Sequence, residues 1–410
     1  MQLTQQIKIK PTKEQEEILL KLSEKCRLLY NFALQERKEA FRKNKECIFY
    51  LKQQNDLPEI KRKFPEYCWV YSKVLQYTLR ILDADYKSFF ALQKKGDRKA
   101  RLPKFKGKKY FTTMVFNQSG FKHRKGLIEL SHKHPSKVKL LFKIPEKFSF
   151  EKIYQVTVYE KDNNFYLSVT YEKQEKKYKN NKLYQAFDLG ATKHTAVNNK
   201  GKFIEFKNER PDKRWEKTIA EIQSRRDHCK KESRKWGRLH KTLAKCKRKS
   251  ANQLKDFQHK LSRKIIYNTK ANTIVIGKLE IKKLAQKSKY AKGLNKSLQN
   301  TGNISRFVRF LTYKAKLEGK RVIGIDERDT TKECCCCGND QEMPLHKRVY
   351  KCDCGNMLDG DENSAVNILL RYLSINGLWT AYQQFVDNLR QTGLTIVRYS
   401  QEAITSKSKF

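Results

Sequence analysis

The chain has 410 residues, and its 90 Lys and Arg against 43 Asp and Glu give it a formal net charge of +47 at pH 7. So large an excess of positive charge indicates a polyanionic partner, and nucleic acid is the expected one. Hydrophobic residues make up 38% of the chain, too many for a disordered basic tail, so the charge is expected on about two to four folded domains. No apolar run approaches the roughly 20 residues of a membrane span, and the N-terminus lacks the apolar core of a signal peptide. We therefore predict a cytoplasmic protein with no membrane partner.

The N-terminal part of the chain contains a group of predicted strands. Residues 3–10 alternate between polar and apolar side chains and end at Pro11, which is typical of one strand. Further strands are expected between residues 114 and 171, with a turn at residues 162–164. Together they predict a small barrel or sheet to which the N-terminal strand also belongs.

Two helices are predicted between the first strand and the others. The first begins after Thr12 and extends to about residue 41, and the second covers about residues 67–92, both with apolar side chains at three- and four-residue steps. Because both come before the remaining strands, the helical residues 11–95 are expected to form an insertion in the strand domain.

A basic loop follows the second helix. Between Lys94 and Lys109 there are nine basic residues and one acid, Asp97, while Gly and Pro residues exclude a regular helix. We predict that this loop contacts a nucleic-acid backbone, with a solvated linker as the alternative. The candidate contacts are Lys99, Arg101, Lys104 and Lys106.

A polar, charged stretch at residues 174–182 has no periodicity and marks a predicted domain boundary. After it come short strands and then, over residues 208–270, long basic helices. The segment 231–250 carries nine Lys or Arg and one acid. Such a helix lies along a phosphate backbone or is a solvated face, and the overall charge favours the first. The candidate contacts are Arg234, Lys235 and Arg238.

The remaining elements alternate between strands and helices. A strand rich in β-branched residues is expected to end at Glu280, and the polar segment 286–303 is long enough for a lid or a disordered loop. A helix and the strand RVIGI follow, and lead to a group of cysteines. Beyond this group we predict another apolar helix, a helical segment through Leu389 and a frayed end.

Four cysteines fall into two close pairs. They are Cys334 and Cys337, followed by Cys352 and Cys354. Two turns that each present two thiolates can complete the tetrahedral coordination that Zn²⁺ prefers. The other cysteines show no paired spacing, which indicates a reducing compartment rather than a disulfide framework. We therefore predict a zinc site, with four unliganded thiols as the alternative, and the adjacent Cys335 and Cys336 leave the choice of ligands open.

Three acidic residues that are far apart in the sequence each stand at the end of an apolar element. Asp188 and Glu280 follow predicted strands, and Asp361 begins an apolar helix. Hydrolysis of a phosphodiester uses divalent cations held by shared carboxylate oxygens, so convergence of these three predicts a catalytic site for Mg²⁺ or Mn²⁺.

Each of the three also has a structural interpretation. Asp188 could stabilise a turn, Glu280 could be a surface residue, and Asp361 could only cap its helix. Neighbouring acids compete for the same role. They are Asp326, Glu327, Asp353 and Asp359.

In order and spacing, these motifs resemble those of the TnpB proteins encoded by insertion sequences, and of the miniature type V CRISPR nucleases related to them. The motifs are FDLGATKHTA, IVIGKLE, TTKECCCCGN, YKCDCG and DGDENSAVNIL. They lie within residues 180–375, whereas residues 1–175 match the family mainly in layout.

The resemblance implies an α+β multidomain protein whose RNase H-like (RuvC) nuclease domain uses Asp188, Glu280 and Asp361 as Mg²⁺ ligands. It also implies a guide RNA transcribed near the gene and cleavage of matching double-stranded DNA beside a short flanking motif, by two-metal-ion hydrolysis. The implied domains are a wedge β-barrel at 1–10 and 96–175, a helical recognition domain at 11–95, the nuclease domain at 180–329 and 358–380, a zinc ribbon at 330–357 and a C-terminal tail at 381–410.

The chain departs from the family at two places. Gly360 stands where the family usually has Arg between two Asp, and the second cysteine pair is shortened to C-x-C. All three acidic positions are filled, which favours an active nuclease over a non-cleaving RNA-guided DNA-binding regulator. A guide-free structure-specific nuclease or transposase is a further alternative. Only the genomic neighbourhood would separate a transposon protein from a CRISPR effector.

Overall fold

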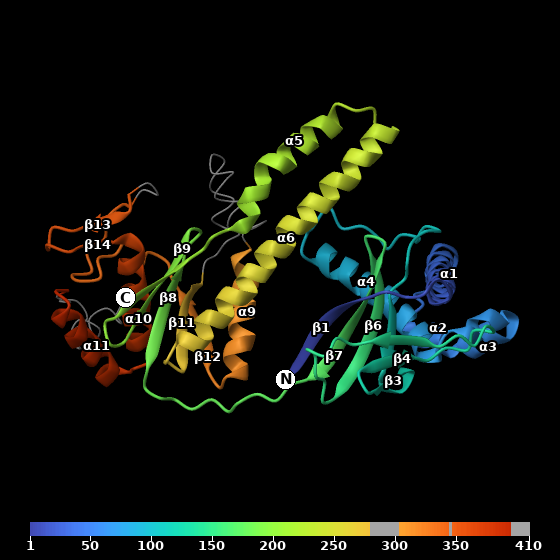
Figure 1. Ribbon diagram of the computed structural model, residues 1–410, viewed down its shortest axis with the longest axis horizontal. Helices are drawn as coiled ribbons and strands as arrows, with labels where there is room; N and C mark the ends of the chain where they lie inside the picture. The colour runs from blue at the N-terminus through green and yellow to red at the C-terminus, as the bar shows by residue number, and fades with distance from the viewer. Residues whose placement is uncertain (279–302, 344–346, 395–410) are drawn as a thin grey trace. The chain divides into compact units, whose positions relative to one another are not determined.

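The computed structural model describes residues 1–278, 303–343 and 347–394. The chain divides between Gln174 and Glu175 into two compact units, called here the N-terminal unit and the C-terminal unit. Both combine β-sheets with helices, so the fold class is α+β, as predicted (Figure 1). No helix among the described residues is long and apolar enough to cross a lipid bilayer.

The N-terminal unit contains two antiparallel sheets, with strand orders β1-β7-β6-β2 and β3-β4-β5. The strands are β1 (Gln2–Ile9), β2 (Met114–Asn117), β3 (Phe121–Arg124), β4 (Leu127–Leu130), β5 (Leu140–Lys143), β6 (Ile153–Lys161) and β7 (Asn164–Glu172). β1 pairs with β7 from Gln2 and Glu172 to Ile9 and Phe165. The N-terminal strand therefore joins the later strands, as predicted, while the closed wedge barrel stays a prediction.

A tight turn sets the register of β6 and β7. Asp162 and Asn163 have φ values of 53° and 56°, and Lys161 pairs directly with Asn164. A two-residue hairpin whose central residues are both left-handed matches the twist of the flanking strands, and Asp and Asn tolerate that conformation better than most residues.

The helices of the N-terminal unit lie between β1 and β2 in the sequence. They are α1 (Lys13–Asn44), α2 (Tyr50–Asn55), α3 (Leu57–Lys63), the 3₁₀ helix η1 (Pro65–Trp69) and α4 (Ser72–Lys94). Thr12 caps α1, since its Oγ1 accepts from the Gln15 backbone N at 3.2 Å and its own backbone N donates to Gln15 Oε1 at 3.1 Å. The second helix begins later than predicted, because Pro65 opens a 3₁₀ turn instead.

The C-terminal unit is built on one mixed sheet with strand order β10-β9-β8-β11-β12. The strands are β8 (Tyr184–Leu189), β9 (Lys193–Asn198), β10 (Phe203–Lys207), β11 (Thr273–Lys278) and β12 (Arg321–Asp326). β8, β11 and β12 are parallel to one another, whereas β9 and β10 are antiparallel to their neighbours. The carboxyl ends of the three parallel strands therefore lie side by side along one border of the sheet, called here its carboxyl edge.

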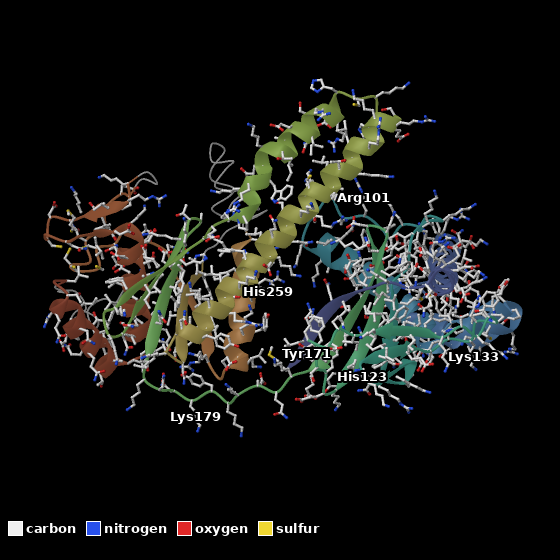
Figure 2. All side chains as sticks on the ribbon, viewed as in Figure 1. Arg101, His123, Lys133, Tyr171, Lys179 and His259 are labelled. Atoms are coloured by element: carbon white, nitrogen blue, oxygen red, sulfur yellow. The ribbon has the colours of Figure 1, made fainter. Side chains whose placement is uncertain are left out.

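Helices cover both faces of this sheet (Figure 1). The helices of this unit are η3 (Pro211–Trp215), α5 (Glu216–Asp227), α6 (Arg234–Asn268), α9 (Ile304–Leu317), α10 (Gly360–Ile375) and α11 (Trp379–Gln391), of which α5 packs on α6 and not on the sheet. Alternate side chains of the strands point to opposite faces. Phe187 and Ile276 pack in the core with α6 and α9, while Ala186 and Val275 pack with α10 and α11. His259 of α6, labelled in Figure 2, stacks on Phe310 of α9.

The C-terminal end of this unit contains the helix that was predicted through Leu389, here α11. The segment from residue 381 was predicted to begin a tail, but it belongs to α11, whose Tyr382, Phe385 and Leu389 are buried in the core. This helix packs through its apolar face, and the frayed end predicted after it lies outside the described residues. The lid predicted at residues 286–303 lies outside the described residues, apart from Asn303, which caps α9.

Candidate active site and cysteine cluster

Asp188 lies near the carboxyl end of β8, at the centre of the sheet. β8 pairs in parallel with β11 as far as Phe187 and Ile276, and Asp188 is the next residue. The chain turns immediately afterwards, because a Cβ at Gly190 would lie 2.5 Å from the backbone oxygen of Lys193. Gly190 thus permits the close turn that fixes Asp188 at the carboxyl end of the central strand.

Asp361 lies in the first turn of α10. Asp359 caps this helix, since its Oδ1 accepts from the Asp361 backbone N at 2.9 Å. The positive end of a helix dipole stabilises acidic side chains in the first turn. The predicted capping role therefore falls mainly to Asp359, and the Asp361 carboxylate is left for other interactions.

Buried amides hold α10 in place beside the sheet. The Asn363 side chain donates to the Glu333 backbone oxygen at 2.8 Å, and the Asn367 side chain donates to the Thr330 backbone oxygen at 2.8 Å. Both asparagines are at most 1% exposed. A buried amide without partners would be costly, so these bonds fix the position of the helix.

The packing of α10 against β8 brings Asp361 into the region of Asp188. Burial raises the pKa of Asp188 well above its ordinary value, and repulsion from Glu327, Asp361 and Asp359 raises it further. Burial and repulsion from Asp359 also raise the pKa of Asp361. Carboxylates raise one another's pKa only when they lie close together in a poorly solvated place. Asp188 and Asp361 therefore lie in one poorly solvated region at the carboxyl ends of the parallel strands.

Lys193, at the start of β9, is a cation at this site that the sequence did not indicate. Its Nζ lies 3.2 Å from Asp359 Oδ2 and 3.7 Å from Asp361 Oδ2, and it also donates to Glu205. Burial alone would lower the pKa of Lys193, but these acidic partners raise it above its ordinary value. The sequence hinted at this role only in that a charged residue begins an otherwise mostly apolar strand.

The third predicted acid, Glu280, lies outside the described residues, so its role stays a prediction. Among the competing acids, Asp326 and Asp353 are exposed, and Asp353 stands in the second cysteine turn. Glu327 is half-buried directly after β12, and burial together with the charge of Asp326 raises its pKa to about 7.

The four predicted zinc ligands lie together. Their sulfur atoms are all within 4.8 Å of one another. The Sγ atoms of Cys334 and Cys354 are 3.7 Å apart, and those of Cys337 and Cys352 are 3.6 Å apart. A tetrahedron with Zn–S bonds of about 2.3 Å has sulfur atoms about 3.8 Å apart, so the donor set suits Zn²⁺.

The two adjacent cysteines that made the ligand choice ambiguous lie outside this group of four. Cys335 and Cys336 are buried in the core with α10, and the Cys335 backbone N donates to Asn363 Oδ1 at 2.9 Å. The cluster is closed by the hairpin of β13 (Val349–Lys351) and β14 (Met357–Asp359). β14 runs directly into α10, so the cluster is joined through this hairpin to the helix that carries Asp361.

The predicted nucleic-acid contacts differ in their exposure. Arg101 lies in the loop after α4 (Figure 2), and it is exposed, as are Lys99 and Lys104. Lys106 differs, because its Nζ lies 3.8 Å from the centre of the Tyr30 ring and its backbone N donates to the Asn31 side chain. Lys106 therefore anchors the loop to α1. The three candidates on α6 are exposed. They are Arg234, Lys235 and Arg238.

Three parts of this chain match models of known protein families. Residues 166–288 match a family model described as a probable transposase of the OrfB/IS605 type, and residues 305–368 match one described as a Cas12f1-like TNB domain. Residues 1–46 match a model described as a helix-turn-helix domain, although they fold here as β1 and the single helix α1.

Relatives and solved structures agree with these matches. A Streptomyces pristinaespiralis protein named a putative RNA-guided DNA endonuclease is 25% identical over 97% of this chain and 95% of its own length. A TnpB-like protein of Acanthamoeba polyphaga mimivirus is 34% identical, over 33% of this chain and 26% of its own length. The solved Cas12f1–sgRNA–target DNA complex contains a chain with a TM-score of 0.58 at 15% identity, covering 87% of this chain and 83% of that one.

The fold is thus that of a small type V effector such as Cas12f1. Parts of the chain match domains of the OrfB/IS605 transposase family, and TnpB-like proteins are among its relatives, which agrees with the resemblance drawn from its motifs.

Proposed function

We propose that this protein is an RNA-guided DNA endonuclease that hydrolyses phosphodiester bonds at a divalent-metal site in its C-terminal unit. The observation that supports the proposal is that Asp188, near the carboxyl end of β8, and Asp361, in the first turn of α10, lie in one poorly solvated region where α10 packs against β8. The name of the Streptomyces relative, which is similar over nearly the whole chain, supports the same activity.

We assign the C-terminal unit to the RNase H-like (RuvC) class of nuclease domains. Its mixed sheet with three parallel strands and helices on both faces supports this assignment. In the N-terminal unit, we assign the strands to a wedge and the helices from α1 to α4 to a recognition insertion. The pairing of β1 with β7, across the helical segment, supports that division.

The acidic site suits Mg²⁺ or Mn²⁺. Hard cations prefer carboxylate oxygens, and the repulsion that raises the pKa of Asp188 and Asp361 would be relieved by a cation between them. Divalent ions bound there would supply the Lewis acidity that hydrolysis of a phosphodiester requires.

The residues of the chain prepare this site before substrate arrives. Asp188 is fixed by β8 and the turn at Gly190, while Asp361 is fixed by the cap and the buried amides of α10. Lys193 holds Asp359 and Asp361 at set positions through its ion pairs. Groups that are positioned in advance in a poorly solvated place stabilise a charged transition state without a cost of reorganisation at the moment of reaction.

We further propose that the four clustered cysteines bind Zn²⁺ and that this site has a structural role. The hairpin of the cluster continues into α10, so bound Zn²⁺ would keep the first turn of α10, with Asp361, beside β8. Structural zinc sites contribute their binding energy to folding.

The guide RNA and target DNA are expected to bind through exposed basic residues, including those of the loop after α4 and of α6. With a net charge of +47, the contacts to phosphate should dominate affinity. Base pairing with the guide would supply sequence choice, so that the protein itself reads only a short flanking motif.

The experiment is to express the protein together with the DNA that flanks its gene, sequence the RNA that co-purifies, and offer the complex a plasmid carrying the matching target beside a randomised flank. With Mg²⁺ the plasmid should be cut, and Asp188→Asn should lower the rate by at least about 100-fold while DNA binding remains. Asp387→Asn, which removes an exposed acid of α11, is the matched control and should cut normally.

Two results would contradict the proposal. Cleavage that survives removal of the RNA by ribonuclease would indicate a guide-free nuclease. Target binding by the wild-type complex without any cut in Mg²⁺ or Mn²⁺ would indicate a non-cleaving regulator.

A further inference from the structure

The carboxyl edge of the sheet presents three neighbouring positions on the parallel strands β8, β11 and β12. Phe187 pairs with Ile276, and Gly277 pairs with Ile325. Asp188, the residue after Phe187, is therefore beside Gly277, the residue after Ile276. Glu327 follows the end of β12 at the same edge.

These three positions face the same side of the sheet. Ala186, Val275 and Ile325 pack in the core that contains α10, and side chains two residues apart on a strand point the same way. Asp188 and Gly277 are each two residues beyond members of that core, and so is Glu327, which directly follows the strand. They consequently lie on the face that carries α10, whose first turn contains Asp361.

Gly277 leaves room that Glu327 fills. A Cβ built on Gly277 would lie 1.8 Å from Glu327 Oε2 and 2.8 Å from its carboxyl carbon. The carboxylate of Glu327 therefore occupies the space into which a side chain at position 277 would extend, next to Asp188. Consistent with this, Glu327 contributes more than any other charged side chain to the raised pKa of Asp188.

The Glu327 carboxylate also lacks part of the hydrogen bonding that a buried acid needs. Its Oε2 atom is buried and has no hydrogen-bond partner among the described residues. A buried carboxylate oxygen without a donor is costly, and such atoms call for a specific explanation. A cation shared with Asp188 and Asp361 would supply the missing partner.

We propose that Glu327, reaching across Gly277 from β12, is the third carboxylate of the metal site, in the place that the sequence motif gives to Glu280. This assignment rests on the proposed nuclease function, because it concerns the same site. Glu327 acts as a direct ligand, and Gly277 is required because any side chain there would exclude its carboxylate.

The test compares two isosteric variants, Glu327→Gln and Glu280→Gln, with Glu342→Gln as a control in which an exposed acid is neutralised. The full-length protein is freed of nucleic acid at high salt, and Mn²⁺ binding is followed by the electron paramagnetic resonance of the free ion. Zinc content and circular dichroism establish that each variant is folded.

Glu327→Gln should weaken Mn²⁺ binding at least ten-fold and lower cleavage by the RNA-loaded protein, whereas Glu280→Gln and Glu342→Gln should match the wild type. A ten-fold loss in Glu280→Gln, or an unchanged Mn²⁺ affinity in Glu327→Gln, would overturn the assignment. Asp188→Asn is measured in parallel. If Asp188→Asn loses Mn²⁺ and Glu327→Gln does not, only the assignment of Glu327 fails, but if neither does, the proposed function fails too.

Discussion

Replacing Gly277 by Ala perturbs the proposed metal site without removing any charge. The new methyl group would begin 1.8 Å from Glu327 Oε2, whereas Cβ atoms in real structures essentially never approach another atom closer than 3.0 Å. The obstructing oxygen is at the end of a flexible side chain, so the carboxylate is expected to move furthest, while Glu327 Cβ, at 2.9 Å, needs to shift only slightly.

The size of this movement decides the outcome. To reach 3.0 Å, Oε2 has to retreat by at least about 1.2 Å, while metal–ligand distances tolerate only about 0.2 Å. Loss of a group that merely orients a ligand costs about 10- to 100-fold in metal affinity, so displacement of a ligand itself should cost at least about ten-fold. That factor corresponds to about 1.4 kcal/mol of binding free energy.

The assay is Mn²⁺ binding by paramagnetic resonance, followed by plasmid cleavage with the RNA-loaded protein. Gly237→Ala is the matched control, because a Cβ at that position of α6 meets no atom within 4 Å. Unchanged Mn²⁺ affinity and cleavage in a folded Gly277→Ala protein would refute the placement of Glu327 in the site.

Three further outcomes are expected. His194 is buried against Phe307, and burial lowers its pKa from 6.5 to about 4. The unfolded chain therefore binds the proton first, so His194 should contribute a loss of about 2 kcal/mol of stability from pH 8 to pH 5, opposite in sign to the contribution of the acids whose pKa is raised. The difference in urea unfolding between wild type and His194→Leu should show this contribution. Cys334→Ser should release zinc, measured by atomic absorption, and lower the melting temperature of the C-terminal unit; an unchanged melting curve would argue against a structural zinc. Alanine at the basic positions of α6 should reduce the slope of log nucleic-acid affinity against log salt concentration by up to about 0.9 for each phosphate that the helix no longer neutralises. An unchanged slope would mean that these side chains face solvent and contact no phosphate. Those positions are Arg234, Lys235 and Arg238.

Local patterns were sufficient for most of the secondary structure. The capping of α1 by Thr12 and the turn at Asp162 and Asn163 follow from residues close together in the sequence, and both formed as expected. The start of α4 was misplaced, because the 3₁₀ turn at Pro65 competes with the helix over the same few residues.

The cysteine cluster was equally predictable from the spacing of the cysteines in the sequence. Two short turns bring each pair of thiols together by local geometry, and the hairpin joins the pairs. What spacing left open was the role of Cys335 and Cys336, which depends on the helix α10 that packs against them.

The sequence by itself determined a basic, α+β nucleic-acid protein with Asp188 and Asp361 each at the end of an apolar element, because composition and periodicity are carried by neighbouring residues. Only the tertiary structure decided which acids lie near one another. Strand register and the direction of each side chain depend on pairing between distant segments, and these set Glu327 against Gly277 beside Asp188. Lys193 belongs to the same site for the same reason, since its acidic partners come from another strand and from α10.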